Sequence, residues 1–494
     1  MEYLAGLDLG TTEVKGGFFS LSGDLLACSM ASYGLSTEEC PGAATSDPGE
    51  WWRAFCRVLT VCTSKAPPGI LKGIAVGSHG PSLVALDRRG RPVRSSLIWM
   101  DRRAVEEALY IQGKTGRRTD AAWYIPKALW LKNKEPDTFR EIRWLMQPLD
   151  YLTYRLTGTI KASLCSEHLR PWDEITIEAA GLDRSLFPPY ALMSELLGHV
   201  SASASRATGL PEGTPVFSGT GGADFVEVLL GASTLEEGAI CDKGGTTQGV
   251  NLCWRAPIRG HGFFTIPHPL LPSSFHIGAM LSTTGKALQW YKDLFYHRRT
   301  PYEKVLLEAE KSPPGAKGLF FLPYLAGARA PWWDPHARGV FFGLSLAHRR
   351  EDLARAIIEG VAYEIASITK LFKGEGASLG AVTTSGGQAR SSFWSQIKAD
   401  VTGLPVKVPR IVNGETLGMA LIAGKGAGLY QSLIEASRRL VRIAEVFEPR
   451  EGLHQFYHEK VALFEKLYPS LRESFLELPA TEKGDCGDRK DTEA

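Results

Sequence analysis

Gly6-Leu7-Asp8-Leu9-Gly10-Thr11-Thr12, followed by Val14-Lys15-Gly16-Gly17-Phe18-Phe19, is the stretch on which the fold depends. An apolar run ends in an acid, turns through glycine and two hydroxyl residues, and resumes as a second run, which predicts strand, tight turn and strand. Glycine and small hydroxyl residues let backbone N–H groups approach phosphate oxygens, and a carboxylate beside them can hold Mg2+ through its waters. The turn is therefore either a phosphate clamp or an ordinary hairpin in which Asp8 and Thr11 bond to the local backbone.

A second turn of the same kind follows about one domain later. Residues 239–247 read Ala-Ile-Cys-Asp-Lys-Gly-Gly-Thr-Thr, again an apolar run, glycine and two hydroxyl residues, with a second strand expected near Val250. Two such turns indicate paired domains that grip a polyphosphate, and not a solenoid, whose repeats are roughly 20–50 residues long. A further glycine-rich turn, Gly386-Gly387-Gln388-Ala389-Arg390, follows a predicted strand at 382–385 and opens onto a helix.

Length and composition indicate a multidomain α/β protein. A chain of 494 residues is too long for one hydrophobic core, so two or three domains are expected. The formal net charge is +2 and basic residues form no long run, so we expect no nucleic-acid partner. No apolar run has the length of a membrane span, and the eight cysteines are scattered without a Cys-x-x-Cys pair. These features predict a cytoplasmic protein with free thiols and no membrane association.

Local patterns place the other elements. A helix is expected after Asp47, with Trp52, Phe55 and Leu59 on one face, and it should end before Pro67. The strands expected at 70–76 and 97–99 are followed closely by His79 and Asp101. Residues 103–211 are mainly helical by pattern, residues 215–217 read as a strand, and helices are expected at 225–230 and 350–372.

Over nearly its whole length the chain resembles the FGGY family of carbohydrate kinases, and its xylulokinase-like branch most. The most specific piece is Gly339-x-Phe341-x-Gly343-Leu344, then seven residues, then Asp352-Leu353-x-x-Ala356-Ile357-Ile358-Glu359. The turn at Asp8 is similar to the family's first phosphate loop, Gly245-Thr246-Thr247 to its second, and Gly386-Gly387-Gln388-Ala389-Arg390 to its adenosine loop. One departure is Ser78, which stands where the family has methionine before His79.

The resemblance implies an architecture and an activity. It implies an α/β fold of two actin-like, ribonuclease-H-like ATPase domains that flank a deep cleft. We expect an N-terminal domain at 1–243 for sugar and phosphate, a C-terminal domain at 244–435 for the nucleotide, C-terminal helices at 436–478 and a disordered tail at 479–494. The implied reaction is transfer of the γ-phosphate of ATP, with Mg2+, to a hydroxyl of a ketopentose, with D-xylulose favoured. The fold often dimerises in this family, so a homodimer is possible.

The resemblance also implies roles for individual residues. Asp8 would organise Mg2+, and Asp224 would bind the sugar and act as general base on its hydroxyl. His79 and Asp101 would hold other sugar hydroxyls. The predicted nucleotide contacts are Gly10, Thr11, Thr12, Gly245, Thr246, Thr247, Gly386, Gly387 and Gln388.

Structural alternatives remain open for these residues. Asp224 with Glu227 forms a capping-box pattern at a helix start, a role that needs no catalysis. His79 can be an ordinary turn residue, Asp101 can cap the helix that follows it, and Lys15 can be a solvated strand lysine instead of a phosphate contact.

Two other activities also remain open. One is a kinase for another sugar or polyol, such as ribulose, a pentitol or a glycerol-like substrate. The other is a non-catalytic actin-like nucleotide clamp.

Overall fold

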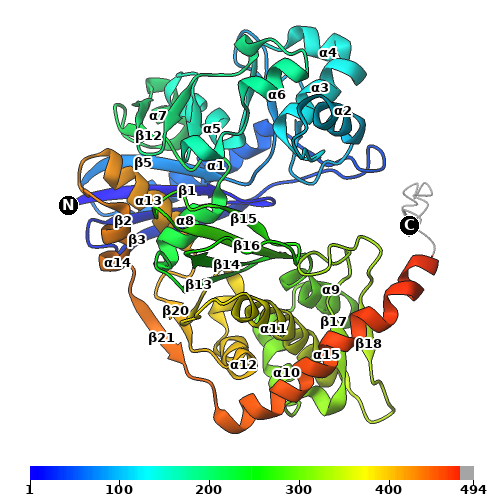
Figure 1. Cartoon of the computed structure of the whole chain (residues 1–494). Helices are drawn as coiled ribbons and strands as arrows, with labels where there is room; N and C mark the ends of the chain where they lie inside the picture. The colour runs from blue at the N-terminus through cyan, green and yellow to red at the C-terminus, as the bar shows by residue number, and fades with distance from the viewer. Residues whose placement is uncertain (246, 479–494) are drawn as a thin grey trace, which may run out of the picture. The chain divides into compact units, whose positions relative to one another are not determined.

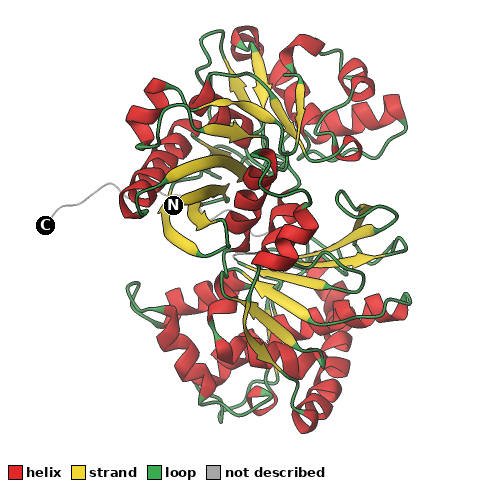
Figure 2. Ribbon diagram, turned by 90° about the vertical axis from the view of Figure 1, so that its left-hand side faces the viewer, coloured by secondary structure: helices red, strands yellow, loops and turns green. Residues whose placement is uncertain are grey.

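The structure, a computed structural model, describes residues 1–245 and 247–478, which form two compact units. Unit 1 contains Met1–Leu235, Pro269–Pro272 and Asn413–Arg442, and unit 2 contains Glu236–His268, Ser273–Val412 and the described residues from 443 onward. The domain boundaries predicted at 243 and 435 stay predictions, and the predicted tail at 479–494 lies outside the described residues. In each unit, helices pack on a mixed sheet (Figures 1 and 2).

The main sheet of unit 1 is built around its first strand. Its strand order is β11 (Leu196–His199), β12 (Pro215–Phe217), β5 (Ile70–Ser78), β1 (Glu2–Leu9), β2 (Glu13–Ser20) and β3 (Leu25–Ser32). β1 and β2 form the predicted hairpin, in which Gly6 pairs with Gly17 and Leu9 with Val14. β1 also runs parallel to β5, and β5 runs parallel to β12. The carboxyl ends of these three parallel strands therefore meet at one edge of the sheet.

Glycines let helices approach both faces of this hairpin. A Cβ on Gly6 would lie 1.8 Å from the carbonyl oxygen of Thr416 in α13 (Gly414–Gly426), and one on Gly16 would lie 2.5 Å from Val58 in α1 (Pro48–Lys65). Because the paired residues Gly6 and Gly17 face α13 while Gly16 faces α1, the two helices cover opposite faces. α1 begins as predicted, since the Asp47 carboxylate accepts the Gly49 N–H at 2.7 Å.

The remaining elements of unit 1 are short. Residues 103–211 are mainly helical as predicted, although four short strands, β8 to β11, interrupt the helices. The helices are α2 (Val105–Thr115), α3 (Tyr124–Lys134), α4 (Pro136–Glu141), α5 (Pro148–Thr157), α6 (Glu174–Ala179), α7 (Ala202–Thr208), α8 (Asp224–Ala232) and α14 (Leu433–Leu440). The two-residue and three-residue strands are β4 (Thr45–Ser46), β6 (Val84–Leu86), β7 (Ser96–Leu97), β8 (Trp144–Met146), β9 (Ala162–Leu164) and β10 (Tyr190–Leu192), with 3-10 turns η1 (Glu167–Leu169) and η2 (Arg184–Leu186).

Unit 2 repeats the topology of unit 1. Its strand order is β15 (Phe264–Pro267), β16 (Phe275–Leu281), β14 (Gln248–Trp254), β13 (Ile240–Gly244), β19 (Val382–Ser385), β20 (Val406–Pro409) and β21 (Ile443–Phe447). β13 is antiparallel to β14 and parallel to β19, as β1 is to β2 and β5, and β20 is parallel to β19 as β12 is to β5. The duplication predicted from the two similar turns is therefore confirmed at the level of strand pairing.

The core of unit 2 forms around one long helix. α11 (Arg350–Gly374) matches the helix predicted at 350–372, and its buried residues include Ile357, Val361, Ile365 and Ile368. The other elements are α9 (Gly285–Phe295), α10 (Tyr302–Glu310), α12 (Ser392–Thr402), α15 (Glu451–Glu477), β17 (Phe320–Leu322), β18 (Val340–Phe342), η3 (Ala316–Gly318) and η4 (Gly387–Arg390).

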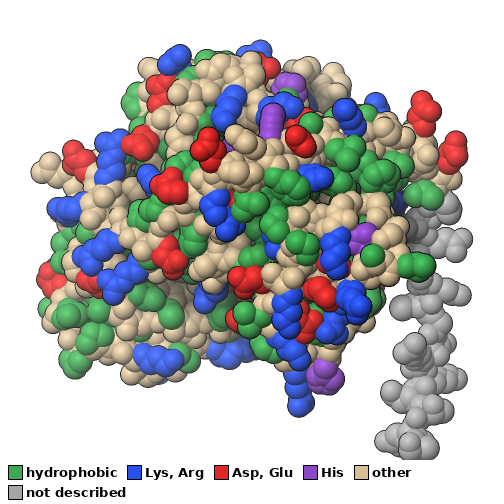
Figure 3. All heavy atoms as spheres, turned by 90° about the horizontal axis from the view of Figure 1, so that it is seen from below, with side chains coloured by type: hydrophobic (Ala, Val, Ile, Leu, Met, Phe, Trp, Pro, Cys, Tyr) green, Lys and Arg blue, Asp and Glu red, His purple; other side chains and the backbone are tan. Residues whose placement is uncertain are grey.

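The surface carries charges of both signs. On the face shown in Figure 3, Lys and Arg side chains are interspersed with Asp and Glu, as the small formal net charge of +2 leads one to expect. Across residues 1–245 and 247–478, every helix is too short or too polar to pass through a bilayer.

Candidate active site

Three of the predicted functional side chains follow the parallel strands of unit 1. Asp8 is near the end of β1, His79 follows β5 directly, and the turn that leads to Asp224 follows β12. The register pairs Asp8 with Gly77 and Leu9 with Ser78, and the His79 N–H donates to the Leu9 carbonyl at 2.8 Å. Ligands of α/β sheets bind beyond the carboxyl ends of parallel strands, so this edge is the candidate site of unit 1.

The first turn is a tight loop of small residues next to a buried carboxylate. The Gly10 N–H bonds to the Glu13 carbonyl at 2.9 Å, and a Cβ on Gly10 would lie 3.3 Å from that oxygen. The Asp8 side chain is buried, whereas Thr12 is exposed at the tip of the turn. Lys15 lies 3.4 Å from Glu13 and 3.9 Å from Glu415, so its ammonium neutralises acids of the same unit. The turn thus presents small residues and a carboxylate at the strand edge.

His79 is buried and neutral. Its Nδ1 is 2.9 Å from the hydroxyl of Ser82. Its ring and the ring of Trp51 pack in a T-shaped arrangement, with their centroids 5.6 Å apart. Burial, with a smaller effect of the Lys127 charge, lowers the pKa of His79 to about 3. Its Nε2 is buried and has no hydrogen-bond partner among the residues that the structure describes. A neutral ring with one orphaned nitrogen is able to bond a hydroxyl group of a ligand.

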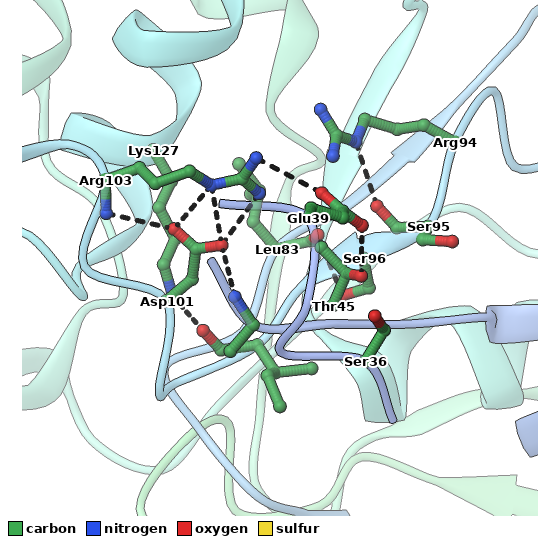
Figure 4. Close-up of polar contacts among 12 residues, drawn as sticks. Ser36, Glu39, Thr45, Leu83, Arg94, Ser95, Ser96, Asp101, Arg103 and Lys127 are labelled. Atoms are coloured by element: carbon green, nitrogen blue, oxygen red, sulfur yellow. Dashed lines mark hydrogen bonds and ion pairs between the residues drawn. The ribbon is translucent and has the colours of Figure 1, made fainter. Parts of the chain in front are cut away.

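Asp101 is held by a bidentate ion pair and a backbone bond (Figure 4). Its carboxylate accepts from Arg103 at 2.8 Å and from the Ala44 N–H at 2.9 Å, and its side chain is 1% exposed. The Arg103 guanidinium also stacks on Trp130 at 4.4 Å and contacts Glu39 at 3.3 Å. The α2 helix begins at Val105, so Asp101 lies before the N-cap, which is Ala104. The predicted sugar contact of Asp101 stays a prediction, while its bonds show that it fixes Arg103 and the segment at Ala44.

Lys127, which sequence reasoning did not single out, ties two loops of the site together. Its ammonium donates to the Pro81 carbonyl at 2.9 Å and to the Ile98 carbonyl at 2.7 Å, so it joins the loop after His79 to the loop before Asp101. Figure 4 shows this side chain beside the Asp101 and Arg103 pair. Burial lowers the pKa of Lys127 to about 7, although the charge of Asp101 opposes the shift.

The Lys127→Met variant is expected to change how stability depends on pH. Because the pKa of Lys127 falls from 10.5 unfolded to about 7 folded, the unfolded chain binds more protons between these values. This group therefore makes the wild type more stable as the pH rises from about 7 to 10, by at most about 1.4 kcal/mol per pH unit, and that stability is lost as the pH falls from about 10 to 7, with little further change below 7. Urea unfolding at several pH values should show a flatter dependence in Lys127→Met.

A lysine on the same helix provides the control for this prediction. Lys132 is exposed on α3, where its ammonium donates to the Gly181 carbonyl at 2.6 Å. Lys132→Met should keep the wild-type dependence on pH, because the exposed Lys132 side chain is not removed from water on folding. Equal slopes for the wild type and Lys127→Met would show that Lys127 is not a strongly shifted group.

The turn before Asp224 packs against the turn after His79. A Cβ on Gly80 would lie 3.3 Å from the Cα of Gly222, and one on Gly222 would lie 2.9 Å from the hydroxyl of Tyr124. Gly222 has φ 78°, a left-handed conformation that suits glycine. Asp224 is half-buried and is the first residue of α8. The N-cap of α8 is Ala223, so Asp224 is not the cap residue of a capping box. Glu227 instead accepts a bond from Thr220 at 3.4 Å.

A hydrogen-bonded set of buried polar side chains packs against this turn. The Tyr124 hydroxyl donates to Gln147 at 3.2 Å, and the Gln147 amide donates to Asp150 at 3.0 Å. Asp150 also accepts the Ser163 N–H at 2.7 Å, and burial raises its pKa to about 7 against the effect of these bonds. Sequence reasoning missed Tyr124, Gln147 and Asp150. The stretch at 124–130 partly matches the family's N-terminal signature, which is the one signal that pointed there.

Unit 2 presents the predicted nucleotide turns at the ends of β13 and β19. Gly245 follows β13, and its N–H bonds to the Thr247 carbonyl at 2.9 Å, while Thr246 lies outside the described residues. Gly386 has φ 85°, and a Cβ there would lie 2.5 Å from the Gly244 carbonyl, so glycine is required for the two turns to meet. Gly387 is exposed with open space around its Cα, and Gln388 is buried beneath it.

Fold and turns together define a class of protein. Each unit has a hairpin with a glycine and hydroxyl turn, followed by parallel strands whose carboxyl ends carry further polar loops. Such duplicated α/β units have the architecture of the actin-like ATPase fold.

Comparisons with known proteins assign the chain within this class. Residues 3–231 match the N-terminal domain of the FGGY family of carbohydrate kinases and residues 243–427 match its C-terminal domain. A xylulose kinase of Staphylococcus epidermidis is 28% identical, covering 97% of this chain and 98% of its own. An autoinducer-2 kinase of Yersinia enterocolitica is 30% identical over 91% of this chain and 90% of its own. The crystal structure of a ligand-bound xylulose kinase from Lactobacillus acidophilus superposes with a TM-score of 0.82 at 24% identity, over 97% of this chain and 100% of that one.

This chain belongs to the FGGY family of carbohydrate kinases. It is therefore a phosphotransferase that uses ATP and acts on an alcohol group of a carbohydrate, and the resemblance inferred from the sequence is confirmed. The non-catalytic nucleotide clamp that the sequence left open does not hold, because the family match covers both units of a kinase.

Proposed function

We propose that this enzyme phosphorylates a hydroxyl of a ketopentose, with D-xylulose favoured, and that Asp224 is the general base. The observation that carries the proposal is the buried, neutral His79, whose Nε2 has no partner among the described residues and which follows the strand beside Asp8. An orphaned buried nitrogen is costly unless a ligand completes it. A sugar hydroxyl is such a ligand, since it both donates and accepts hydrogen bonds.

The position of Asp224 supports its proposed role as the base. It is half-buried at the start of α8, and the Gly222 turn before it packs on Gly80, the residue after His79. A hydroxyl bonded to His79 is therefore near the segment that carries Asp224. When the hydroxyl oxygen attacks the γ-phosphorus, the carboxylate takes the hydroxyl proton and the bond from phosphorus to the bridging oxygen breaks, so ADP leaves. A base of this kind contributes a factor of about 10²–10⁴ to the rate.

The phosphate and metal roles belong to the two hairpin turns. In unit 1 the proposed phosphate contacts are Gly10, Thr11 and Thr12, and in unit 2 they are Gly245, Thr246 and Thr247. Among the described residues, Asp, Glu, His and Cys form no cluster of three that would hold a metal alone, which suits Mg2+ bound by one carboxylate, waters and phosphate oxygens. Asp8, a buried acid at the end of β1, fits as that carboxylate. Bound Mg2+ would neutralise charge on the transferring phosphoryl group.

Further proposals concern the nucleoside, compartment and assembly. Gly386, Gly387 and Gln388 would contact the nucleoside, and Asp101 would act on the sugar together with Arg103. A reducing cytoplasm is the proposed compartment, since the seven cysteines within the described residues are free thiols. Association as a homodimer stays a prediction.

A screen of ADP release identifies the acceptor. ATP and Mg2+ would be incubated with pentuloses, hexuloses, pentitols, glycerol and, because an autoinducer-2 kinase is among the relatives, autoinducer-2. We expect release to be fastest with D-xylulose and slow without sugar, because the site is shaped to accept a sugar hydroxyl in preference to water. ADP release that no sugar stimulates would refute the proposed reaction. Faster release with another acceptor would show that this acceptor, and not D-xylulose, is the preferred substrate, and the proposed role of Asp224 would stand.

A further inference from the structure

A buried chain of polar side chains lies beneath the proposed nucleotide loop of unit 2. The carboxylate of Asp242 on β13 accepts a hydrogen bond from the amide of Gln248 on β14. The Gln248 carbonyl oxygen accepts the amide of Gln388 at 3.2 Å, and that amide also donates to the Thr284 hydroxyl at 3.3 Å. Asp242, Gln248 and Gln388 are at most 5% exposed. The chain thus joins the first hairpin of unit 2 to η4.

The carboxylate determines the direction of this chain. An ionised carboxylate only accepts hydrogen bonds, so Gln248 must turn its NH2 group toward Asp242 and its oxygen toward Gln388. Gln388 must then present its own NH2 group to that oxygen, which turns its carbonyl oxygen the other way. The Gln388 carboxamide consequently lies against the strand end before the phosphate turn, where a Cβ on Gly244 would be 2.6 Å from its Cδ and 2.7 Å from its Oε1.

A buried lysine balances the charge of Asp242. The Lys398 ammonium on α12 pairs with the Asp242 carboxylate, and the Thr384 hydroxyl on β19 donates to the same oxygen at 3.1 Å. The side chains of Lys398 and Asp242 are 2% and 0% exposed. A buried charge is tolerated only when it is paired and hydrogen-bonded, and the Asp242 carboxylate accepts from Lys398, Thr384 and Gln248.

We propose that Gln388 is a positioning residue that holds the nucleotide loop of unit 2 against its phosphate turn, and that Asp242 with Lys398 sets the orientation of its amide. The inference rests on the proposed nucleotide role of these two turns. In addition to the nucleoside contact proposed for it above, Gln388 keeps Gly386 and Gly387 at a constant distance from Gly245, an effect that the Asp242 variants below test without changing Gln388 itself. Loss of this link separates the two groups of nucleotide contacts, so ADP and ATP bind more weakly. The sugar contacts proposed at His79 and Asp224 belong to unit 1, so sugar binding does not change.

The test compares nucleotide and sugar binding in variants of the full chain. In Gln388→Leu we expect the Kd for ADP, measured by calorimetry, and the KM for ATP to rise about five- to tenfold, the size of one lost hydrogen bond. The KM for the sugar should stay within about twofold. Gln396→Leu is the matched control, because Gln396 lies on α12 and bonds Asp400, so it should leave both constants unchanged. If Gln388→Leu does not fold, Gln388→Met replaces it.

A second pair of variants separates amide orientation from simple stability. Asp242→Asn alone leaves the Lys398 ammonium without its charge partner, so its Tm should fall. Asp242→Asn with Lys398→Met removes both charges, so Tm should recover while the Kd for ADP stays raised, because a neutral Asn amide bonds Gln248 in either orientation.

Three results would overturn the inference. The first is a rise of sugar KM equal to that of ATP KM in Gln388→Leu, the second is no change in either KM, and the third is wild-type ADP affinity in the double variant. ADP binding is measured without sugar turnover. A wild type that binds ADP but phosphorylates no sugar would therefore refute the proposed reaction and leave this inference standing.

Discussion

Replacing Asp224 with asparagine is expected to lower kcat by a factor of about 10²–10⁴. The amide has the size of the carboxylate, but it takes no proton at neutral pH, so the sugar hydroxyl attacks the γ-phosphate without a base. Because Asp224 is in the first turn of α8 and not at its N-cap, loss of its charge removes only the interaction with the helix dipole, about 0.3–1 kcal/mol, so the fold should be preserved. Steady-state ADP release would measure kcat, and calorimetry would show that ATP and sugar still bind.

The control for Asp224→Asn is another acid at a helix start. Asp173 is the N-cap of α6 and accepts the Thr176 N–H at 2.9 Å, far in sequence from the proposed site. Asp173→Asn should keep both turnover and stability, since Asn is an equally good N-cap. Turnover of Asp224→Asn close to that of Asp173→Asn would remove Asp224 from the role of base.

The Gly221→Ala variant is expected to lose about 2–4 kcal/mol of unfolding free energy and about 100-fold in kcat. Gly221 has φ 54°, and its Cβ would lie 2.2 Å from the Ser163 carbonyl oxygen. Ser163 yields little, because its N–H is bonded to the buried Asp150 at 2.7 Å. The turn must therefore move, and it carries Asp224 three residues later. Urea unfolding would measure the loss of stability and ADP release the loss of turnover.

A second glycine variant distinguishes the cost of a steric clash from the cost of a strained backbone conformation. Gly213 also has a positive φ, 82°, but nothing lies within 4 Å of its added Cβ. Gly213→Ala should lose only the strain of about 1 kcal/mol and keep its kcat. Equal losses in Gly213→Ala and Gly221→Ala would mean that the approach to Ser163 is not what holds the turn.

Much of the fold could be predicted because local signals agreed with it. The hairpin at Gly6–Phe19, the helix after Asp47 and the long α11 helix follow from alternation, capping and helical periodicity, all of which act over a few residues. The turn after β13 predicted the duplicated topology, because it repeats the order of strand, glycine and hydroxyl residues that the turn after β1 has. The short strands β8 to β11 were not predicted, because segments of three or four residues carry too little periodicity.

The candidate site was predicted in part. Asp8, His79 and Asp224 could be found because Asp8 lies near the end of a strand, His79 follows a strand and Asp224 follows a glycine-rich turn, which places each at a sheet edge. Their predicted roles in metal binding, sugar binding and catalysis stay predictions. Lys127 and Asp150 were missed, since a lysine and an acid within helical patterns are usually exposed, and only the structure shows them buried at the site.

What the sequence determined by itself was the class of protein: the two glycine and hydroxyl turns after apolar strands and the later motifs indicated an FGGY kinase, and the family match confirms that class. Only the tertiary structure decided which polar side chains bond to one another. It paired Asp101 with Arg103, gave His79 an orphaned nitrogen, and joined Asp242 to Lys398 across 156 positions of the chain. The physical reason is range: turn geometry and strand pattern depend on neighbouring residues, whereas burial and charge pairing depend on residues that only folding brings together.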